Sequence, residues 1–397
     1  MKDLLAHIKK LSSEYSNVTI EWRRHLHAHP ELSFKEFNTS TFVAKQLKSV
    51  GISQLTTLTE TGLSFTIQGK NPNKKIIALR ADMDALPIEE TNEISYKSTN
   101  KGVMHACGHD VHTSSLLTTA RILNEIKDQF DGSVKFIFQP GEEKNPGGAS
   151  LMIKDGVLQN PTPQAIIGQH VMPLVPVGKI GFREGPYMAS SDEIYIKVIG
   201  KGGHGAVPDL TIDPIVIASH LIIALQQIVS RNANPKQPSV LTFGKISGEG
   251  ATNIIPDEVN IAGTFRTLNE PWREAALSKI KTMAESLIEG MGGKCEIKIS
   301  RGYPTLTNDP SLTQRMRRAA EDYIGKENVV DIEVTMASED FAFYAKEIPA
   351  TFYRLGTRNE AKGITSYVHT STFNIDEDAL IIGPGLMAWM AVKELMS

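Results

Sequence analysis

The first part of the chain alternates short apolar runs with segments of helical periodicity. Apolar runs that end at turn-forming or polar residues predict strands near 62–68, 75–80, 133–139 and 164–168. Strands that alternate with helices are typical of a layered α/β domain, so we expect a central, mostly parallel sheet.

Helices are expected before, between and after those strands. Residues 1–50 predict two helices that are broken at His29-Pro30, because proline disfavours the helical conformation of the residue before it. A further helix is expected over 112–129, where apolar residues recur every three to four positions. The last one is expected near 378–396.

The pattern changes after Gly185-Pro186. Ile194, Ile196 and Val198 alternate with polar residues, which predicts a half-exposed strand. The elements expected next are a helix over 214–231, strands over 239–247 and 257–267, a helix over 271–290 and a strand over 294–300. This β-α-β-β-α-β order is the ferredoxin-like arrangement, so we expect an inserted second domain.

The length of the chain agrees with this division, since hydrophobic cores stop growing near ~250–300 residues and the chain has 397. We expect 1–186 and 301–397 to form the two parts of one α/β domain, and 187–300 to form the inserted ferredoxin-like domain.

Composition narrows the class of protein. Hydrophobic residues make up 41% and charged residues 22% of the chain, as in ordinary globular proteins. A net charge of −3 gives no reason to expect a nucleic acid or an anionic membrane as partner. Two cysteines cannot form a disulfide framework, and we see neither a secretory signal nor a run of ~20 apolar residues. We therefore expect a cytoplasmic protein.

Several predicted strands end in residues that carry chemistry. The strand over 133–139 runs through Pro140-Gly141 into Glu142-Glu143, the strand over 75–80 is followed by Asp82 and Asp84, and the strand over 164–168 by His170. Ligands bind at the C-terminal ends of strands in open α/β sheets, so we expect these groups to share one crevice. Adjacent glutamates point in different directions, which suggests one metal ligand and one proton carrier.

Cys107-Gly108-His109 is the sharpest local signal. A glycine between them lets thiolate and imidazole converge, and these are groups that zinc and similar metals bind. An isolated Cys-x-His is more often a buried cysteine beside a chance histidine, but the polar strand ends favour a metal. The alternative is that His109 activates Cys107 as a nucleophile, which leaves the paired glutamates and His170 unexplained.

Other polar residues give little evidence of a functional site when each is considered alone. His25, His27 and His29 diverge at a spacing of two on a helix, so we interpret them as surface histidines. His204 lies in a glycine-rich turn and His369 in a loop. Asn253 and Arg266 are also weak indications of a functional site when taken alone.

Taken together, these motifs resemble those of peptidase family M20, the aminoacylase and carboxypeptidase metallopeptidases, and most closely its amidohydrolase subgroup. The resemblance covers nearly the whole chain. Its motifs are 23–27 (RRHLH), 30–33 (PELS), 80–87 (RADMDALP), 104–110 (MHACGHD), 139–143 (QPGEE), 202–208 (GGHGAVP) and 337–341 (ASEDF), with the loop of His369.

The resemblance implies a catalytic domain with two divalent ions, Zn²⁺ or Mn²⁺ before Co²⁺ or Ni²⁺, and an inserted lid and dimerisation domain. The residues at the family's ligand positions are Cys107, His109, Glu143, His170 and His369. Glu142 would be the general base, and His204, Asn253 and Arg266 would contact substrate from the lid. Asp82 stands where the wider family has a histidine, so the roles of Asp82 and Asp84 stay open, with Asp84 favoured as a supporting residue.

The resemblance therefore implies hydrolysis of small N-acyl amino acids. Two alternatives stay open: an exopeptidase on the same scaffold, and a binding protein without turnover. The apolar helix over 214–231 and the family resemblance suggest a homodimer through the inserted domain, in which His204 acts within its own chain or on the partner subunit. Neither the acyl group nor the amino acid follows from the sequence.

Overall fold

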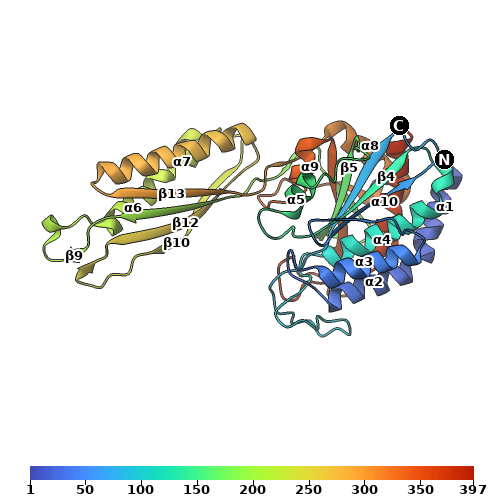
Figure 1. Ribbon diagram of the computed structural model, residues 1–397, viewed down its shortest axis with the longest axis horizontal. Coiled ribbons are helices and arrows are strands. Elements are labelled where there is room, and N and C mark those ends of the chain that lie inside the picture. The colour runs from blue at the N-terminus through green and yellow to red at the C-terminus, as the bar shows by residue number, and fades with distance from the viewer. The chain divides into compact units, whose positions relative to one another are not determined.

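The computed structural model describes residues 1–397, and the chain forms two compact units. The larger unit comprises Met1–Gly185, Thr307–Glu333 and Asp340–Ser397. The smaller unit comprises Pro186–Leu306 and Val334–Glu339, and its last segment falls within the range 301–397 that the sequence assigned to the larger domain. Each unit is built around its own sheet (Figure 1). Each unit also has its own hydrophobic core.

The larger unit contains an eight-stranded mixed sheet in the order β1-β2-β4-β3-β5-β16-β6-β15. Neighbours from β4 through β3 and β5 to β16 pair in parallel, so their C-terminal ends meet at one edge. The expected mostly parallel sheet is thus confirmed. The strand bounds are β1 Thr56–Leu58, β2 Gly62–Gln68, β3 Ile76–Asp82, β4 Ser133–Gln139, β5 Ile166–Pro176, β6 Ile180–Phe182, β15 Val329–Asp331 and β16 Ala350–Arg358.

The central strand β4 is buried along its whole length, as expected when helices cover both faces of a sheet. Val134, Phe136 and Phe138 alternate along it and join the main hydrophobic core. Lys135 points to the other face, where its Nζ donates hydrogen bonds to the backbone oxygens of Val157 (2.7 Å) and Gln159 (2.6 Å). These contacts satisfy the ammonium group of a residue that is 4% exposed.

Helices α4 and α10 pack on one face of the sheet, and the short helices α5 and α9 lie against the other. The N-terminal region forms three helices where the sequence predicted two, because the chain also breaks at Tyr15 (φ −91°, ψ 0°). The bounds are α1 Lys2–Glu14, α2 Ser16–Ala28, α3 Phe37–Ser49, α4 His109–Glu125, α5 Gly148–Lys154, α8 Pro310–Ile324, α9 Ala342–Glu347 and α10 Ala379–Leu395.

The smaller unit has a four-stranded antiparallel sheet in the order β10-β12-β8-β13. The strands are β8 Asp192–Ile199, β10 Ser239–Ser247, β12 Glu258–Thr267 and β13 Lys294–Arg301. Helices α6 (Pro214–Leu225) and α7 (Glu270–Gly290) contact each other and the sheet (Figure 1). This is the ferredoxin-like arrangement that the order of elements predicted.

Helix α6 begins where Asp213 accepts hydrogen bonds from the backbone N–H groups of Ile215 (2.8 Å) and Val216 (3.3 Å). It ends at Leu225, earlier than predicted, and a π-helical turn follows. By length and composition alone, Pro214–Asn232 could cross a membrane. In the structure, one side of α6 joins the core of the small unit, while Ile215, Val216 and Ile223 are exposed.

Candidate metal centre

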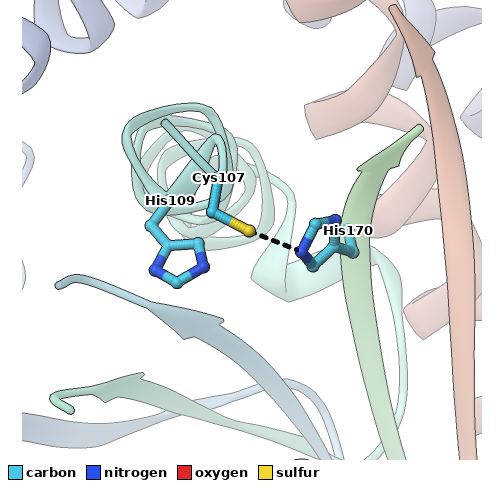
Figure 2. A group of neighbouring side chains, drawn as sticks. All are labelled: Cys107, His109 and His170. Atoms are coloured by element: carbon cyan, nitrogen blue, oxygen red, sulfur yellow. Dashed lines mark hydrogen bonds between the residues drawn. The ribbon is translucent and has the colours of Figure 1, made fainter. Parts of the chain in front are cut away.

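Three polar side chains converge at the C-terminal edge of the large sheet. Cys107 precedes α4, His109 is its first residue, and His170 lies on β5. Figure 2 shows the Cys107 thiol facing His170, with Sγ and Nε2 3.4 Å apart. One donor atom from each of the three residues fits within 4.8 Å of the others, close enough to hold one ion.

Gly108 makes this convergence possible. Its φ of +84° is one that residues with a side chain rarely adopt. A Cβ at this position would also lie 2.6 Å from Cγ2 of Val171, so the chain passes too close to β5 for any other residue. The Cys-Gly-His motif therefore reads as a tight turn that leads directly into α4.

A second donor group shares Cys107 with the first. Cys107, Glu143 and His369 also have donor atoms within 4.8 Å of one another. His369 Nε2 lies 3.2 Å from Glu143 Oε1. The backbone N–H of His369 donates to the oxygen of Ala106 (2.7 Å), and this bond holds His369 at an unusual φ of +62°. Two donor groups with one common thiol are the arrangement expected of a two-metal site.

Hydrogen bonds at Nδ1 of two imidazoles fix which ring nitrogen carries the proton. His109 Nδ1 donates to Asp84 Oδ1 (3.2 Å), and His170 Nδ1 donates to the backbone oxygen of Val171 (2.7 Å). In its neutral form, each ring therefore presents the lone pair of Nε2. His109 Nε2 is buried and has no hydrogen-bond partner, which is rare for a buried nitrogen. Thiolate, imidazole and carboxylate are suitable ligands for zinc and neighbouring transition metals, so these residues fit such ions.

The electrostatics of the group favour a cation. Burial lowers the pKa of His109, but the carboxylates of Asp82, Asp84 and Glu143 outweigh it and raise that pKa to about 10. Burial, followed by the charges of Glu143 and Glu142, raises the pKa of the Cys107 thiol well above its usual value. A nucleophilic cysteine needs the opposite shift, and Nδ1 of His109 is occupied by Asp84, so the nucleophile alternative finds no support.

Glu142 lies beside this group without belonging to the two triads that contain Cys107. Its Oε2 lies 4.0 Å from His109 Nε2, and its Oε1 accepts a hydrogen bond from the backbone N–H of Asp340 (3.4 Å). The side chain of Asp340 is itself held by Arg80 (2.8 Å) and by the amide nitrogen of Gln139 (2.7 Å). The carboxylate of Glu142 is therefore oriented from behind by a buried network.

His112 and Arg80 are buried residues that the sequence did not single out. His112 Nδ1 donates to Asp82 Oδ1 (2.6 Å), and its Nε2 accepts from the backbone N–H of Val171 (2.9 Å). Arg80 donates to Asp82 Oδ2 (2.6 Å). Asp82 thus pairs with two side chains, and its Oδ2 also lies 3.8 Å from His109 Nε2, whereas Asp84 accepts a hydrogen bond from His109 Nδ1. The position of His112, three residues after His109 on one helix, was the available signal.

The interpretation of His27 as a surface histidine was wrong. Its side chain is fully buried, with Nδ1 2.8 Å from Asp110 and Nε2 3.2 Å from Glu90. Arg23, also buried, donates to the same oxygen of Asp110 (2.7 Å). The helical spacing correctly separated His27 from His25 and His29, but spacing alone gave no sign of acidic partners from distant segments.

The smaller unit brings His204 and Asn253 together. His204 on β9 (Gly203–His204) pairs with Ile254 on β11 (Ile254–Ile255), and Gly205 donates to the oxygen of Asn253 (2.9 Å). His204 is exposed, and its Nδ1 accepts from the N–H of Ala206 (3.0 Å), so the neutral ring carries its proton on Nε2.

Arg266 lies on β12 and donates to the backbone oxygen of Met336 (3.0 Å). Its pKa is lowered by burial, and no carboxylate forms an ion pair with it. The guanidinium therefore retains N–H donors that no carboxylate uses.

Comparisons with known proteins extend these observations. Residues 78–391 match the model of peptidase family M20/M25/M40. The N-acetyl-L-cysteine deacetylase of Bacillus subtilis (strain 168) is 43% identical over 359 residues, which cover 90% of this chain and 84% of that protein. Thermostable carboxypeptidase 1 of Saccharolobus solfataricus is 39% identical over 399 residues, which cover 98% and 99% of the two chains.

A solved structure shares both fold and sequence. The crystal structure of the Bacillus subtilis YXEP protein, a dinuclear metal-binding peptidase from family M20, has a TM-score of 0.84 and 35% identity to this chain. The match covers 96% of this chain and 99% of the YXEP chain.

A mostly parallel sheet with thiol, imidazole and carboxylate groups gathered at one edge is typical of metal-dependent hydrolases of the α/β class. The chain belongs to peptidase family M20/M25/M40 and, within it, to the amidohydrolase subgroup. It is a metal-dependent amidohydrolase.

Proposed function

We propose that the protein hydrolyses the amide bond of small N-acyl amino acids and releases a carboxylate and a free amino acid. The observation that carries the proposal is the pair of donor groups that share Cys107, with the carboxylate of Glu142 alongside. The similarity to an N-acetyl-L-cysteine deacetylase supports an N-acyl amino acid as substrate. A chain that keeps a buried thiol suits a reducing compartment, so we place the activity in the cytoplasm.

Five residues would hold the metal in this proposal: Cys107, His109, Glu143, His170 and His369. We expect two divalent ions, zinc or manganese in the first place, because mixed sulfur, nitrogen and oxygen ligands suit both as well as cobalt and nickel. Such ions would lower the pKa of the attacking water and polarise the scissile carbonyl. Asp84 would serve them by keeping the proton of His109 on Nδ1.

Glu142 would act as the general base. The hydrogen bond from the backbone N–H of Asp340 to Oε1 would orient this carboxylate to take the proton of the attacking water. The same carboxylate would then return the proton to the departing amine. Glu142 is 6% exposed, so few other water molecules can compete for that proton.

Residues of the small unit would bind the substrate. His204 would donate from Nε2 to the oxyanion that develops on the scissile carbonyl. Arg266 and Asn253 would bind the carboxylate of the amino-acid half, and the guanidinium suits this role because it has no acidic partner of its own. Closure of the small unit as a lid would exclude water.

The exposed apolar side chains of α6, Ile215, Val216 and Ile223, support a homodimer through the small unit. Two copies that bury these side chains against each other would remove an apolar surface from water. In such a dimer, His204 of one subunit would act either in its own chain or in the partner's site. We expect no contact with nucleic acid or membrane as part of this function.

An exopeptidase acting on dipeptides is the second candidate, and the similarity to a thermostable carboxypeptidase favours it. A binding protein without turnover is the third. Initial rates on N-acetyl, N-benzoyl and dipeptide substrates that share one amino acid separate the three. Faster hydrolysis of the N-acyl compounds supports the proposal, faster hydrolysis of the dipeptides supports the exopeptidase, and no hydrolysis by metal-loaded protein would refute both enzymes.

A further inference from the structure

Glu36 is a buried carboxylate to which the proposed chemistry assigns no role. It lies immediately before α3, is 0% exposed and has no cationic partner. Burial, and next the charge of Asp84, raise its pKa to about 7. An ionisable group in such a place destabilises the fold unless its contacts compensate, so those contacts indicate its purpose.

Three hydrogen bonds converge on the Glu36 carboxylate. Oε1 accepts from the backbone N–H groups of Phe34 (2.9 Å) and Gly141 (2.8 Å), and Oε2 accepts from Thr61 Oγ1 (3.0 Å). Gly141 is the residue directly before Glu142. The carboxylate therefore ties the segment before α3 to the turn that carries the proposed base.

The turn at Gly141 is fixed from a second side. Gly141 has a φ of +62°, and a Cβ added there would lie 2.3 Å from the ring of Phe34. Phe34 itself has a φ of +63°, which is costly for an aromatic residue. Because Oε1 of Glu36 accepts from both backbone N–H groups, it holds these two unusual conformations against each other.

The same short segment reaches the far end of the turn. Ser33 Oγ donates to Asp84 Oδ2 (2.6 Å), and that oxygen also accepts from the backbone N–H of Glu143 (2.9 Å). Residues 33–36 thus contact the chain just before Glu142 through Glu36, and just after it through Ser33 and Asp84. Both glutamates project from a stretch of backbone that is anchored at its two ends.

We propose that Glu36 is a positioning residue for hydrolysis: through Gly141, its carboxylate sets the direction in which Glu142 and Glu143 leave the backbone. This inference rests on the proposed roles of Glu142 as base and Glu143 as ligand. Its distinguishing consequence is that loss of the acceptor at Oε1 disturbs turnover and metal affinity, whereas loss of the contact at Oε2 does not.

Three variants test this distinction. Glu36→Leu has a similar volume but no acceptor, so the N–H groups of Phe34 and Gly141 lose their partner. Glu36→Gln keeps an oxygen for both. Thr61→Val removes only the third hydrogen bond and is the matched control for stability. For each variant, kcat, KM, Tm and zinc affinity against a competing chelator are measured.

We expect Glu36→Leu to lower kcat at least tenfold with KM within about threefold, and to weaken zinc affinity by about tenfold or more, as for other residues that orient ligands. Glu36→Gln should stay within about threefold of the wild type in every constant. Thr61→Val should lower Tm while kcat stays unchanged. A Glu36→Leu protein with wild-type kcat and zinc affinity would overturn the proposal, whatever its Tm.

Glu36→Asp keeps the experiment decisive if Glu36→Leu does not fold. It retains the charge but withdraws the carboxylate by one methylene, so we expect a lower kcat and weaker zinc binding, and wild-type values for both would overturn the proposal. Zinc affinity also separates the positioning role of Glu36 from the proposed hydrolysis of N-acyl amino acids. If the wild type hydrolysed no N-acyl amino acid, the proposed function would fail, while the zinc titrations would still decide whether Glu36 positions Glu143.

Discussion

The backbone N–H of Asp340 donates a hydrogen bond to Oε1 of Glu142 at 3.4 Å. Asp340 belongs to the last part of the chain and Glu142 to the end of β4, so the proposed base is oriented by a segment 198 positions away in sequence. The bond is made by the main chain, which means that no side-chain substitution at residue 340 removes it directly.

Glu142→Gln should therefore fold and keep its metal but lose turnover. The amide oxygen can still accept from Asp340, whereas an amide cannot take a proton from water. We expect kcat to fall by about 10²–10⁴-fold or more, because one group serves both proton transfers. Steady-state kinetics and elemental analysis of the same sample check this. A near-normal kcat with full metal content would assign the base to another residue, with Asp84 the next candidate.

Removal of the metal should abolish hydrolysis reversibly. Prolonged treatment with a chelator is expected to remove activity, and zinc or manganese to restore it, because the thiol and imidazoles converge on one place. Cys107→Ser should lower the number of bound ions per chain, since Cys107 belongs to both donor groups. Full activity of rigorously metal-free protein, lost on alkylation of the thiol, would instead revive Cys107 as nucleophile.

Asp84→Asn tests the orientation of His109. The substituted amide oxygen can still accept from Nδ1, but the amide nitrogen then faces the N–H of Glu143, which is a second donor. We expect metal affinity to fall by about 10–100-fold, as is typical when a partner behind a metal ligand is altered. Ser33→Ala, which removes only one bond to Asp84, is the control and should change affinity far less.

Lys135 makes the free energy of unfolding depend on pH, and this residue lies away from the proposed metal site. Burial lowers its pKa from 10.5 to about 8. Below pH 8 the ammonium is charged in both states and its burial destabilises the fold in full. Between pH 8 and 10.5 the folded protein releases the proton while the unfolded chain keeps it, so the free energy of unfolding rises with pH.

The matched variant is Lys135→Gln, which keeps N–H donors for the oxygens of Val157 and Gln159 but does not titrate. From pH 8 to 10.5, urea unfolding should show the wild type gaining about 1–2 kcal/mol relative to this variant, a figure reduced for partial solvent screening. Parallel pH profiles of the two proteins would contradict the prediction.

Assembly through the small unit predicts a mass of twice 43.6 kDa by light scattering at micromolar concentration. Ile223→Glu should yield monomers, because Ile223 is the most exposed apolar residue of α6. If His204 acts on the partner's site, mixing inactive His204→Ala and Glu142→Gln subunits should restore some activity. A fully active monomer would refute the shared site, and a dimer without complementation would assign His204 to its own chain.

The hydrophobic pattern predicted most of the fold because each element buries a face of its own. The strands expected at 62–68 and 133–139 are Gly62–Gln68 and Ser133–Gln139. The ferredoxin-like order was equally visible, since its strands alternate and its helices are long. The convergence of strand ends also followed from topology alone, because parallel strands place their C-terminal ends at one edge.

The residues that orient the site could not be predicted in this way. Glu36 and Asp340 contact residues from other parts of the chain, and no periodicity or spacing relates such pairs. His27 was misjudged for the same reason, because its acidic partners come from a loop and from another helix. The sequence has no glycine or proline near Tyr15 that would have predicted the extra break between α1 and α2.

Strand β16 lies between β5 and β6 in the sheet although it is made long after both, and the loop that carries His369 follows it. During synthesis, the sheet therefore stays open at its middle until nearly the whole chain has left the ribosome. A growing chain has four of the five proposed ligands but lacks the strand that joins the two parts of the sheet. We therefore expect the proposed ions to bind only after synthesis is complete, and we expect translation that stops before residue 369 to yield no active enzyme.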